Sequence, residues 1–500
     1  MGVVIRQSVK ATIVSNVGAI IGAVLLIYIY PKSLSPEQVG LTRVLTEAGI
    51  FFSSFALMGL TGIAVKYFPY FKDSRNNNNG FSFIIFIVPL IGFLIFLIVF
   101  FVFKEGIITM FSAKSKLFTQ YIIYIIPLTF FWIYITICET YSSILQRIVF
   151  PKLIKEIAVR VLTILVIVLF FFGIISLDQF VFLFVSVYGI ASILIIVYVN
   201  SINKISLKPN FGFLKNPLRK EMLIFMLYVI TISIASNISS RIDVFILSQK
   251  LSLAGTGIFT IAFFIASFIE MPSRAIYQIT TPLASEALKN NDMILVGSLY
   301  KRVAINQLVI ASLIFLLIWV NVDNIFRIMP NGHIYESGKY VILFIGLAKV
   351  FDAATGINTT ILGYSKYYYY TLFFIFGLAA LTIINNLIFI PIYGIVGSAV
   401  ATAISIFLYH SISVFFVNLK LKIQPFSKNT IKAILIVALL FLINSFAPHF
   451  AGAYIDIGVR SLFFLILFII SMYKFRISAD INELVKVANA RFLKGFLPLK

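Results

Sequence analysis

The sequence predicts an all-α, polytopic membrane fold, and three properties of the chain carry this prediction. First, 61% of the 500 residues are hydrophobic and only 12% are charged, which is more apolar and less charged than a soluble domain. Second, the mean hydropathy is +1.04. Third, stretches of about twenty apolar residues recur about fourteen times, and such a stretch crosses a bilayer as a helix that satisfies its own backbone polar groups.

Apolar runs and the breaker residues between them place the predicted spans in order. The first span follows Arg6 and Lys10, and we interpret it as a retained helix because a convincing cleavage site is missing and further spans follow. The spans are expected near residues 10–30, 39–63, 82–103, 120–146, 152–174, 178–200, 221–247, 254–284, 302–321, 339–363, 367–390, 393–417, 431–449 and 457–473.

The loops on one side of the predicted bundle hold most of the 40 lysines and arginines. An even number of spans places both termini on that side, and cytoplasmic loops are the basic ones, so both termini are predicted to be cytoplasmic. The net charge of +22 then follows from membrane insertion and contact with anionic lipids, without nucleic acid as a partner. The opposite loops hold only Lys32, Lys104, Lys114, Lys116, Lys250, Arg327, Lys339 and Arg460.

An internal repeat divides the predicted bundle. A shift of 217 residues, which aligns Gly40 with Gly257, keeps six spans in phase, and duplicated bundles are common among secondary transporters. We therefore expect two pseudo-symmetric six-helix lobes with further segments around them. The predicted parts are an N-lobe at 1–200, a basic cytoplasmic connector at 201–220, a C-lobe at 221–417, two extra helices at 418–474 and an amphipathic basic tail at 475–500.

Four short motifs accompany this layout: residues 34–41 (LSPEQVGL), 60–68 (LTGIAVKYF), 363–366 (GYSK) and 391–399 (PIYGIVGSA). With them the chain resembles, over nearly its whole length, the polysaccharide-transport branch of the multidrug, oligosaccharidyl-lipid and polysaccharide exporter superfamily, the bacterial O-antigen and capsule flippases.

The resemblance implies two lobes in a V around a central cavity lined mainly by spans one, two, seven and eight. It also implies a multi-pass protein of the bacterial inner membrane that works by alternating access. Its cargo would be an undecaprenyl-pyrophosphate-linked oligosaccharide, moved from the cytoplasmic to the outer leaflet for surface polysaccharide synthesis. Membrane lipids, a polysaccharide polymerase and glycosyltransferases are the expected partners.

Charged residues inside the predicted spans are the candidate functional residues, because such residues normally face a cavity or a partner. Arg43 with Glu47 and Glu270 with Arg274 are four residues apart, and Lys349 with Asp352 are three apart, so each pair can share a helix face. Arg241 and Asp243 are too close in sequence to pair so directly. The full set is Arg43, Glu47, Glu139, Arg241, Asp243, Glu270, Arg274, Lys349 and Asp352.

Guanidinium groups bind phosphate oxygens in bidentate geometry, and a pyrophosphate headgroup is strongly anionic. The functional hypothesis is that Arg274 meets the headgroup from the cytoplasmic side, that Arg43 and Arg241 receive it toward the exterior, and that Lys349 adds to the cavity charge. The alternative is that the pairs are structural ion pairs that fix helix packing.

We expect the acidic members of this set to balance the cavity charge or to couple transport to a proton or sodium gradient. They are Glu47, Glu139, Asp243, Glu270 and Asp352. The sequence does not select among them, and it predicts no other cofactor and no metal. The single cysteine, Cys138, excludes disulfides.

The lipid II flippase branch of the same superfamily also uses cavity arginines, so the choice among glycan lipids stays open. Two other functions fit the hydropathy. A multidrug cation exporter of the same superfamily would use an acidic, aromatic cavity, whereas the candidates here are basic as often as acidic. A membrane polymerase or glycosyltransferase would need a large exterior loop or paired carboxylates at an aqueous face, and the predicted exterior loops are short. We expect no catalytic residues, and we interpret His333, His410 and His449 as packing or surface residues.

Overall fold

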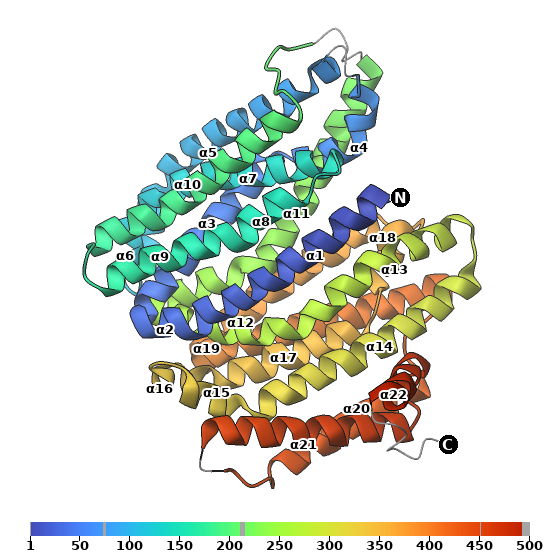
Figure 1. Ribbon diagram of the computed structural model, residues 1–500. Coiled ribbons are helices and arrows are strands. Elements are labelled where there is room, and N and C mark those ends of the chain that lie inside the picture. Colours follow the sequence, from blue (N-terminus) through green and yellow to red (C-terminus); the bar gives the residue numbers. More distant parts are fainter. Residues whose placement is uncertain (1, 74–76, 211–215, 451, 493–500) are drawn as a thin grey trace. The chain divides into compact units, whose positions relative to one another are not determined.

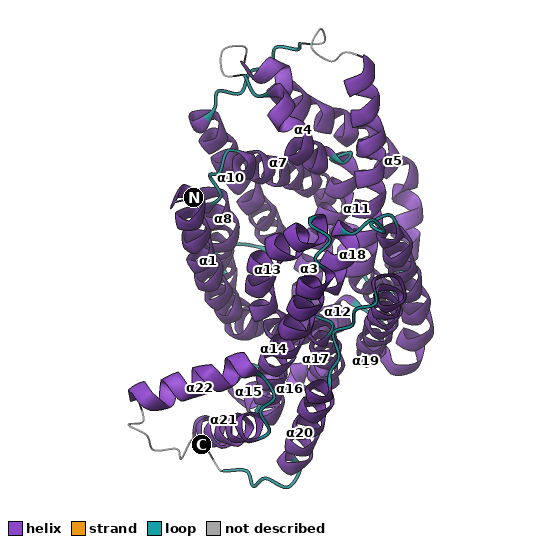
Figure 2. Cartoon of the chain, turned by 90° about the vertical axis from the view of Figure 1, so that its right-hand side faces the viewer, coloured by secondary structure: helices purple, strands orange, loops and turns teal. Residues whose placement is uncertain are grey.

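The computed structural model describes residues 2–73, 77–210, 216–450 and 452–492. In this described part the regular structure is helical throughout, with no strand (Figures 1 and 2). The chain divides into two compact units, residues 1–260 and 261–500, and helix α12 (Leu253–Ser267) runs across the division. The lobe limits predicted from the repeat, 1–200 and 221–417, remain a prediction, and residues 211–215 of the predicted connector lie outside the described residues.

The first unit is built around α3, which packs against α7, α5 and α11, while α10 packs against α7 and α9. Its helices are α1 (Gly2–Ala23), η1 (Val24–Ile29), α2 (Tyr30–Ser33), α3 (Pro36–Ala56), α4 (Leu60–Phe71), η2 (Asn77–Gly80), α5 (Phe81–Ser112), α6 (Lys116–Tyr121), η3 (Ile122–Tyr124), α7 (Ile125–Ile144), α8 (Val149–Leu153), η4 (Ile154–Ala158), α9 (Val159–Phe171), α10 (Leu177–Ile202) and α11 (Asn216–Lys250).

The second unit is built around α17 and α14, with α19 against α17 and with α20 and α21 against α14. Its helices after α12 are η5 (Phe268–Glu270), α13 (Met271–Lys289), α14 (Met293–Val320), α15 (Val322–Ile328), α16 (Gly332–Tyr335), η6 (Glu336–Gly338), α17 (Lys339–Ala354), α18 (Asn358–Tyr364), α19 (Tyr370–Leu421), α20 (Lys428–Asn444), α21 (Ala453–Lys474) and α22 (Ala479–Phe492).

Nine helices in the described part are long and apolar enough to cross a membrane, and two bent pairs raise this number to 11. The bent pairs are α3 with α4, at 44°, and α17 with α18, at 51°. The first break contains Gly59 and the second contains Gly356, and both glycines have a positive φ that other residues adopt only with strain. The structure thus shows a multi-pass membrane protein.

The other predicted spans also lie on helices. Spans 367–390 and 393–417 share α19, which is 52 residues long and is interrupted at Gly394, where φ is 61° and ψ is −135°. Span 152–174 begins in the charged segment of α8 and η4. Span 431–449 lies on α20 only as far as Asn444, and α20 has only 17 residues. The count of about fourteen crossings therefore stays a prediction.

Local sequence explains where key helices begin. Ser35 accepts a hydrogen bond from the Gln38 amide while the Gln38 side chain accepts one from the Ser35 amide, and Pro36 occupies the first turn of α3. Ser176 and Gln179 form the same capping box at α10. Such reciprocal caps satisfy amides that a helix start leaves unpaired, so they fix the entry to each helix.

Aromatic side chains fill the interior of the first unit, where Phe68, Phe81 and Tyr141 pack together with their rings between 5.4 and 6.5 Å apart. In the second unit, α14, α20 and α21 share a buried apolar cluster that includes Leu316 and Phe464. Large apolar side chains also cover the outer surfaces of many helices, as expected where a protein meets lipid tails.

Candidate functional site

In the first unit, one buried carboxylate lies between two arginines. Glu47 is one turn after Arg43 on α3, and Arg43 Nη2 lies 2.8 Å from Glu47 Oε1. Arg241, from α11, contacts the other carboxylate oxygen, Oε2. The Glu47 side chain is only 5% exposed, whereas that of Arg43 is 36% exposed. The structure therefore brings together three predicted site residues in one cluster, here called the Glu47 cluster.

The Glu47 cluster has one more positive than negative charge, since a single carboxylate faces two guanidinium groups. Arg241 is further oriented by Asn237, whose Oδ1 accepts a hydrogen bond of 3.0 Å from Arg241 Nε. Within the described part of the chain, the buried Nε of Arg43 has no hydrogen-bond acceptor. A free buried donor on a cation is a ready partner for an anion.

The second unit contains a cluster of the same composition. Glu270, the last residue of η5, accepts hydrogen bonds from Arg274 Nε at 3.0 Å and Nη2 at 2.9 Å, both to Oε1. Lys349, from α17, contacts the other oxygen, Oε2. This Glu270 cluster again combines two cations with one anion, and the Arg274 side chain is 67% exposed.

Lys349 and Asp352, whose spacing lets them share a helix face, each contact a different partner. The Lys349 ammonium contacts Glu270, and the Asp352 carboxylate instead lies 2.9 Å from His410 Nε2 on α19. The reason is competition between partners: η5 presents a carboxylate to Lys349, while the short Asp352 side chain meets the imidazole of the neighbouring helix. His410 is buried, as a packing residue would be, but it also contacts the Asp352 carboxyl group.

Two predicted acids remain, Glu139 and Asp243. Glu139 on α7 lies 2.8 Å from Lys155 Nζ on η4, and both side chains are about one-third exposed. Asp243 is buried on α11, 5% exposed, two residues after Arg241. The pair of Glu139 with Lys155 joins α7 to η4, which is a structural contact between helices.

Three residues that contact the predicted site residues were not identified from the sequence: Asn237 beside Arg241, His410 beside Asp352, and Thr355, whose hydroxyl lies 3.1 Å from His410 Nδ1. Asn237 lies four residues before Arg241, so helical spacing could have suggested it. His410 is 58 positions after Asp352 on another helix, and nothing in the sequence signals such a tertiary contact. Among the described residues, no group of three or more histidine, cysteine or acidic side chains could hold a metal ion.

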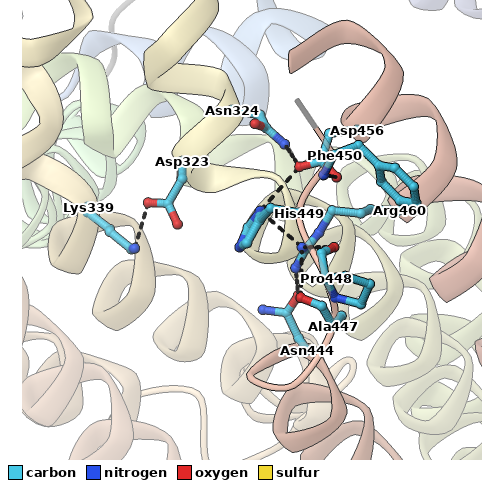
Figure 3. A network of polar contacts seen from close by, with 10 residues as sticks. All are labelled: Asp323, Asn324, Lys339, Asn444, Ala447, Pro448, His449, Phe450, Asp456 and Arg460. Atoms are coloured by element: carbon cyan, nitrogen blue, oxygen red, sulfur yellow. Dashed lines mark hydrogen bonds and ion pairs between the residues drawn. The ribbon is translucent and has the colours of Figure 1, made fainter. Parts of the chain in front are cut away.

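A separate polar network ties α21 to α15 and to the end of α20 (Figure 3). Asp456 on α21 accepts hydrogen bonds from Asn324 Nδ2 at 2.6 Å and from the Phe450 amide at 3.2 Å. Arg460, predicted as a loop residue, is instead buried on α21 at 3% exposure. Its Nη1 lies 3.1 Å from both the Pro448 carbonyl oxygen and His449 Nδ1, and its Nη2 donates to Asn444.

A polar cavity of about 440 Å³ lies beside this network, lined in part by Asp323, Arg327, His333 and His449. Asp323 is already paired with Lys339, at 2.6 Å. The network satisfies buried polar groups where the chain turns from α20 into α21, so its first role is to hold that turn.

Neither a protein-family model nor a curated protein sequence matches the chain. Solved structures do match it. One is described as "Lipid II flippase MurJ, inward closed conformation", with a TM-score of 0.67 and 17% identity over 93% of this chain and 98% of that chain.

Two further matches are a "multidrug resistance MATE family transporter of the MOP superfamily" in inward- and outward-facing conformations. The TM-scores are 0.62 and 0.52, each at 14% identity, over 82% and 84% of this chain and 94% and 95% of those chains. These likenesses show that the chain has the fold of that transporter superfamily. Because lipid flippases and drug transporters share the fold, the cargo must be argued from the site.

Proposed function

We propose that this protein is a flippase, a transporter without enzymatic chemistry, for an undecaprenyl-pyrophosphate-linked oligosaccharide, which it moves from the cytoplasmic to the outer leaflet by alternating access. One observation carries the proposal: each unit holds a cluster of two cations around one carboxylate, namely Arg43 and Arg241 with Glu47, and Arg274 and Lys349 with Glu270. Each cluster keeps one positive charge in excess inside an otherwise apolar body.

An excess positive charge at these positions suits a pyrophosphate. Charge-assisted hydrogen bonds from guanidinium groups to phosphate oxygens are short and strong, and arginine loses less hydration than lysine when it binds. Arg274 is the best placed for first contact because most of its side chain is exposed. The lipid tail of the cargo would stay in the membrane, so only the headgroup needs a polar route.

The carboxylates have a defined part in this cycle. A buried guanidinium without a counter-charge is costly, so Glu47 and Glu270 hold the cations in place when no cargo is bound. When a headgroup arrives, its oxygens replace part of the carboxylate contact, and when it leaves, the carboxylate takes the cation back. This exchange keeps the affinity moderate, which a transporter needs for release.

The main alternative is export of a cationic drug, because the matching structures include a multidrug transporter with the same fold. A cationic substrate needs unpaired carboxylates. In this chain Glu47 and Glu270 each face two cations, and Asp352 faces His410, which argues against that alternative.

We infer that the protein lies in the inner membrane of a bacterial cell with both termini in the cytoplasm, because the loops on that side are the basic ones. The glycosyltransferases that build the cargo would act before this protein and a polymerase would act after it, since the cargo is a lipid-linked glycan.

Export in cells tests the proposal. The variants Arg43→Ala, Arg241→Ala and Arg274→Ala, produced at normal levels in the membrane, should reduce surface glycan and leave the lipid-linked unit inside. Arg147→Ala is a matched control, because Arg147 is an exposed cation outside both clusters. Normal export by Arg274→Ala would refute the role of the Glu270 cluster.

A further inference from the structure

His410 lies buried in α19 with a hydrogen-bonding partner at each ring nitrogen. Its Nε2 lies 2.9 Å from Asp352 Oδ1, and its Nδ1 lies 3.1 Å from the Thr355 hydroxyl. Asp352 and Thr355 are both at the end of α17, so one helix presents two groups to one imidazole. The His410 side chain is 9% exposed and that of Asp352 is 31% exposed, so the carboxylate is the more accessible member.

The hydrogen bond that the Thr355 hydroxyl donates determines whether His410 Nδ1 carries a hydrogen. Thr355 Oγ1 donates to the Asp352 carbonyl oxygen at 2.7 Å, which uses its only proton. Toward His410 the hydroxyl can therefore only accept, so His410 Nδ1 carries a hydrogen and donates it. The tautomer follows from the hydrogen-bond network.

The contact between His410 Nε2 and Asp352 Oδ1 then requires one proton, carried by one of these two atoms. An ionised carboxylate only accepts hydrogen bonds, so if Asp352 is charged, Nε2 must donate and His410 is an imidazolium. If His410 is neutral with its hydrogen on Nδ1, Nε2 only accepts and Asp352 must be protonated. In both cases one proton lies between Nε2 and Oδ1, and the pair as a whole is uncharged.

We propose that Asp352 and His410 form a site that binds and releases one proton within the second unit, and that the structure represents its loaded state. Loss of that proton would place a carboxylate opposite the lone pair of a neutral imidazole, which is repulsive and leaves a net negative charge. Thr355 is a positioning residue, because it fixes the hydrogen on Nδ1.

The titratable groups around this pair connect it to the Glu270 cluster. Lys349 lies one turn before Asp352 on the same helix and contacts Glu270 from η5. Tyr277 on α13 donates to the Gly356 carbonyl at 2.8 Å, and Tyr300 on α14 donates to Asn358 at 2.7 Å, so both hydroxyls are occupied. Tyr409, next to His410 on α19, is near enough to Asp352 to interact with its charge.

The proton changes the charge that an anionic cargo meets. With the pair loaded, Arg274, Lys349 and Glu270 leave one positive charge in excess. With the pair unloaded, the Asp352 carboxylate cancels that charge and competes for Lys349. Proton and anion binding should therefore favour each other, and by linkage each ligand strengthens the other by the same factor. This coupling rests on the proposed function, whereas the proton site itself does not.

The proton site can be tested on the purified full chain, which has only three histidines. Nitrogen-15 NMR of labelled imidazoles, with His410→Gln to assign the His410 signals, reports which ring nitrogens carry hydrogen as pH changes. We expect Nδ1 to stay protonated while Nε2 and the Asp352 carboxyl lose one proton together. In Asp352→Asn, whose amide can donate to Nε2, His410 should remain neutral throughout.

Two results would overturn the proton site: a titration of His410 that Asp352→Asn leaves unchanged, or a His410 signal that sodium ions shift at constant pH. Monodisperse variants that retain the wild-type helical content provide the folding check. Thr355→Val adds a conservative variant, which should weaken the preference for hydrogen on Nδ1 without removing the titration.

The coupling is tested with undecaprenyl pyrophosphate as the probe. Its affinity should rise by roughly fivefold or more as the pair becomes loaded, and His410→Gln should abolish this pH dependence. A constant affinity across the titration refutes the coupling. Absence of binding at every pH, with the His410 titration intact, refutes the proposed function and leaves the proton site standing.

Discussion

Gly40 and Gly257 pack against each other's helices in a reciprocal contact. A Cβ atom on Gly40 would lie 1.9 Å from the Leu253 carbonyl oxygen, and one on Gly257 would lie 2.0 Å from the Pro36 carbonyl oxygen. Pro36 and Leu253 are related by the same shift of 217 residues as Gly40 and Gly257. The two close contacts at the crossing of α3 and α12 are therefore reciprocal, with each glycine against a backbone carbonyl of the other helix.

A methyl group at either glycine should force α3 and α12 apart. We expect Gly40→Ala and Gly257→Ala each to destabilise the protein by about 1–3 kcal/mol, the usual effect of overpacking a tight contact. Thermal unfolding in detergent measures this. Gly106→Ala, in a helix with open space around the glycine, is the control and should not lower the melting temperature.

The Glu47 cluster should depend on balance among its charges. Glu47→Gln leaves Arg43 and Arg241 together without a counter-charge, and removing one partner of a buried pair typically costs about 3–5 kcal/mol. The double variant Glu47→Gln with Arg241→Gln should recover part of that loss. A double variant whose loss equals the sum of the two single losses would show that the residues do not interact.

Arg460 should stabilise the turn between α20 and α21, because three acceptors depend on it: the Ala447 and Pro448 carbonyl oxygens and the Asn444 side chain. Arg460→Met keeps most of the volume and leaves those acceptors unpaired, so the melting temperature should fall by several degrees. Arg327→Met, at an exposed arginine of the second unit, should change it little. Equal effects of the two variants would contradict this role.

Docking of α22 should weaken in acid. The hydrogen bonds of Asp480 to Arg302 Nε, at 2.7 Å, and to Asn306 Nδ2, at 2.6 Å, attach the start of α22 to α14. The bond from Arg302 holds the pKa of the Asp480 carboxyl below its usual range. A lowered pKa means that docking is fully supported above the unfolded value of about 3.9 and is lost as pH falls through the folded value.

Spin labels at Ser298→Cys on α14 and Lys486→Cys on α22 measure this docking, since the native Cys138 is buried. We expect one short distance at neutral pH and a broad distribution below the folded pKa. Asp480→Asn should broaden the distribution at neutral pH, while Glu483→Gln, at an exposed acid of the same helix, should leave it narrow. A distribution that is independent of both pH and Asp480 would refute the attachment.

Helical spacing explains which contacts could be predicted from the sequence. The pairs Arg43 with Glu47 and Glu270 with Arg274 form as predicted, because residues four apart on a helix are neighbours. The partners across helices were not predicted: Arg241 for Glu47, Lys349 for Glu270 and His410 for Asp352. These depend on how helices pack, which hydropathy does not report.

The positions of the helices could also be predicted from the sequence, but the breaks within them could not. Apolar runs located a helix at each predicted span, since burial in lipid requires long helices. They did not reveal that α3 and α17 each end in a sharp bend, or that residues 370–421 form one helix interrupted at Gly394. Those breaks contain residues with positive φ, namely Met58 and Gly59, Gly356, and Gly394, and a hydropathy profile averages over such single positions.

Binding of undecaprenyl pyrophosphate to the full-length protein in lipid nanodiscs tests the central proposal most directly. Wild-type protein should bind this anionic lipid more tightly than uncharged undecaprenol. Arg274→Ala should weaken binding by roughly 10-fold or more, as expected for a lost charge-assisted hydrogen bond, while undecaprenol binding and the Arg147→Ala control stay unchanged. Equal affinity of wild type and Arg274→Ala for undecaprenyl pyrophosphate would contradict the assignment of the Glu270 cluster as a headgroup site.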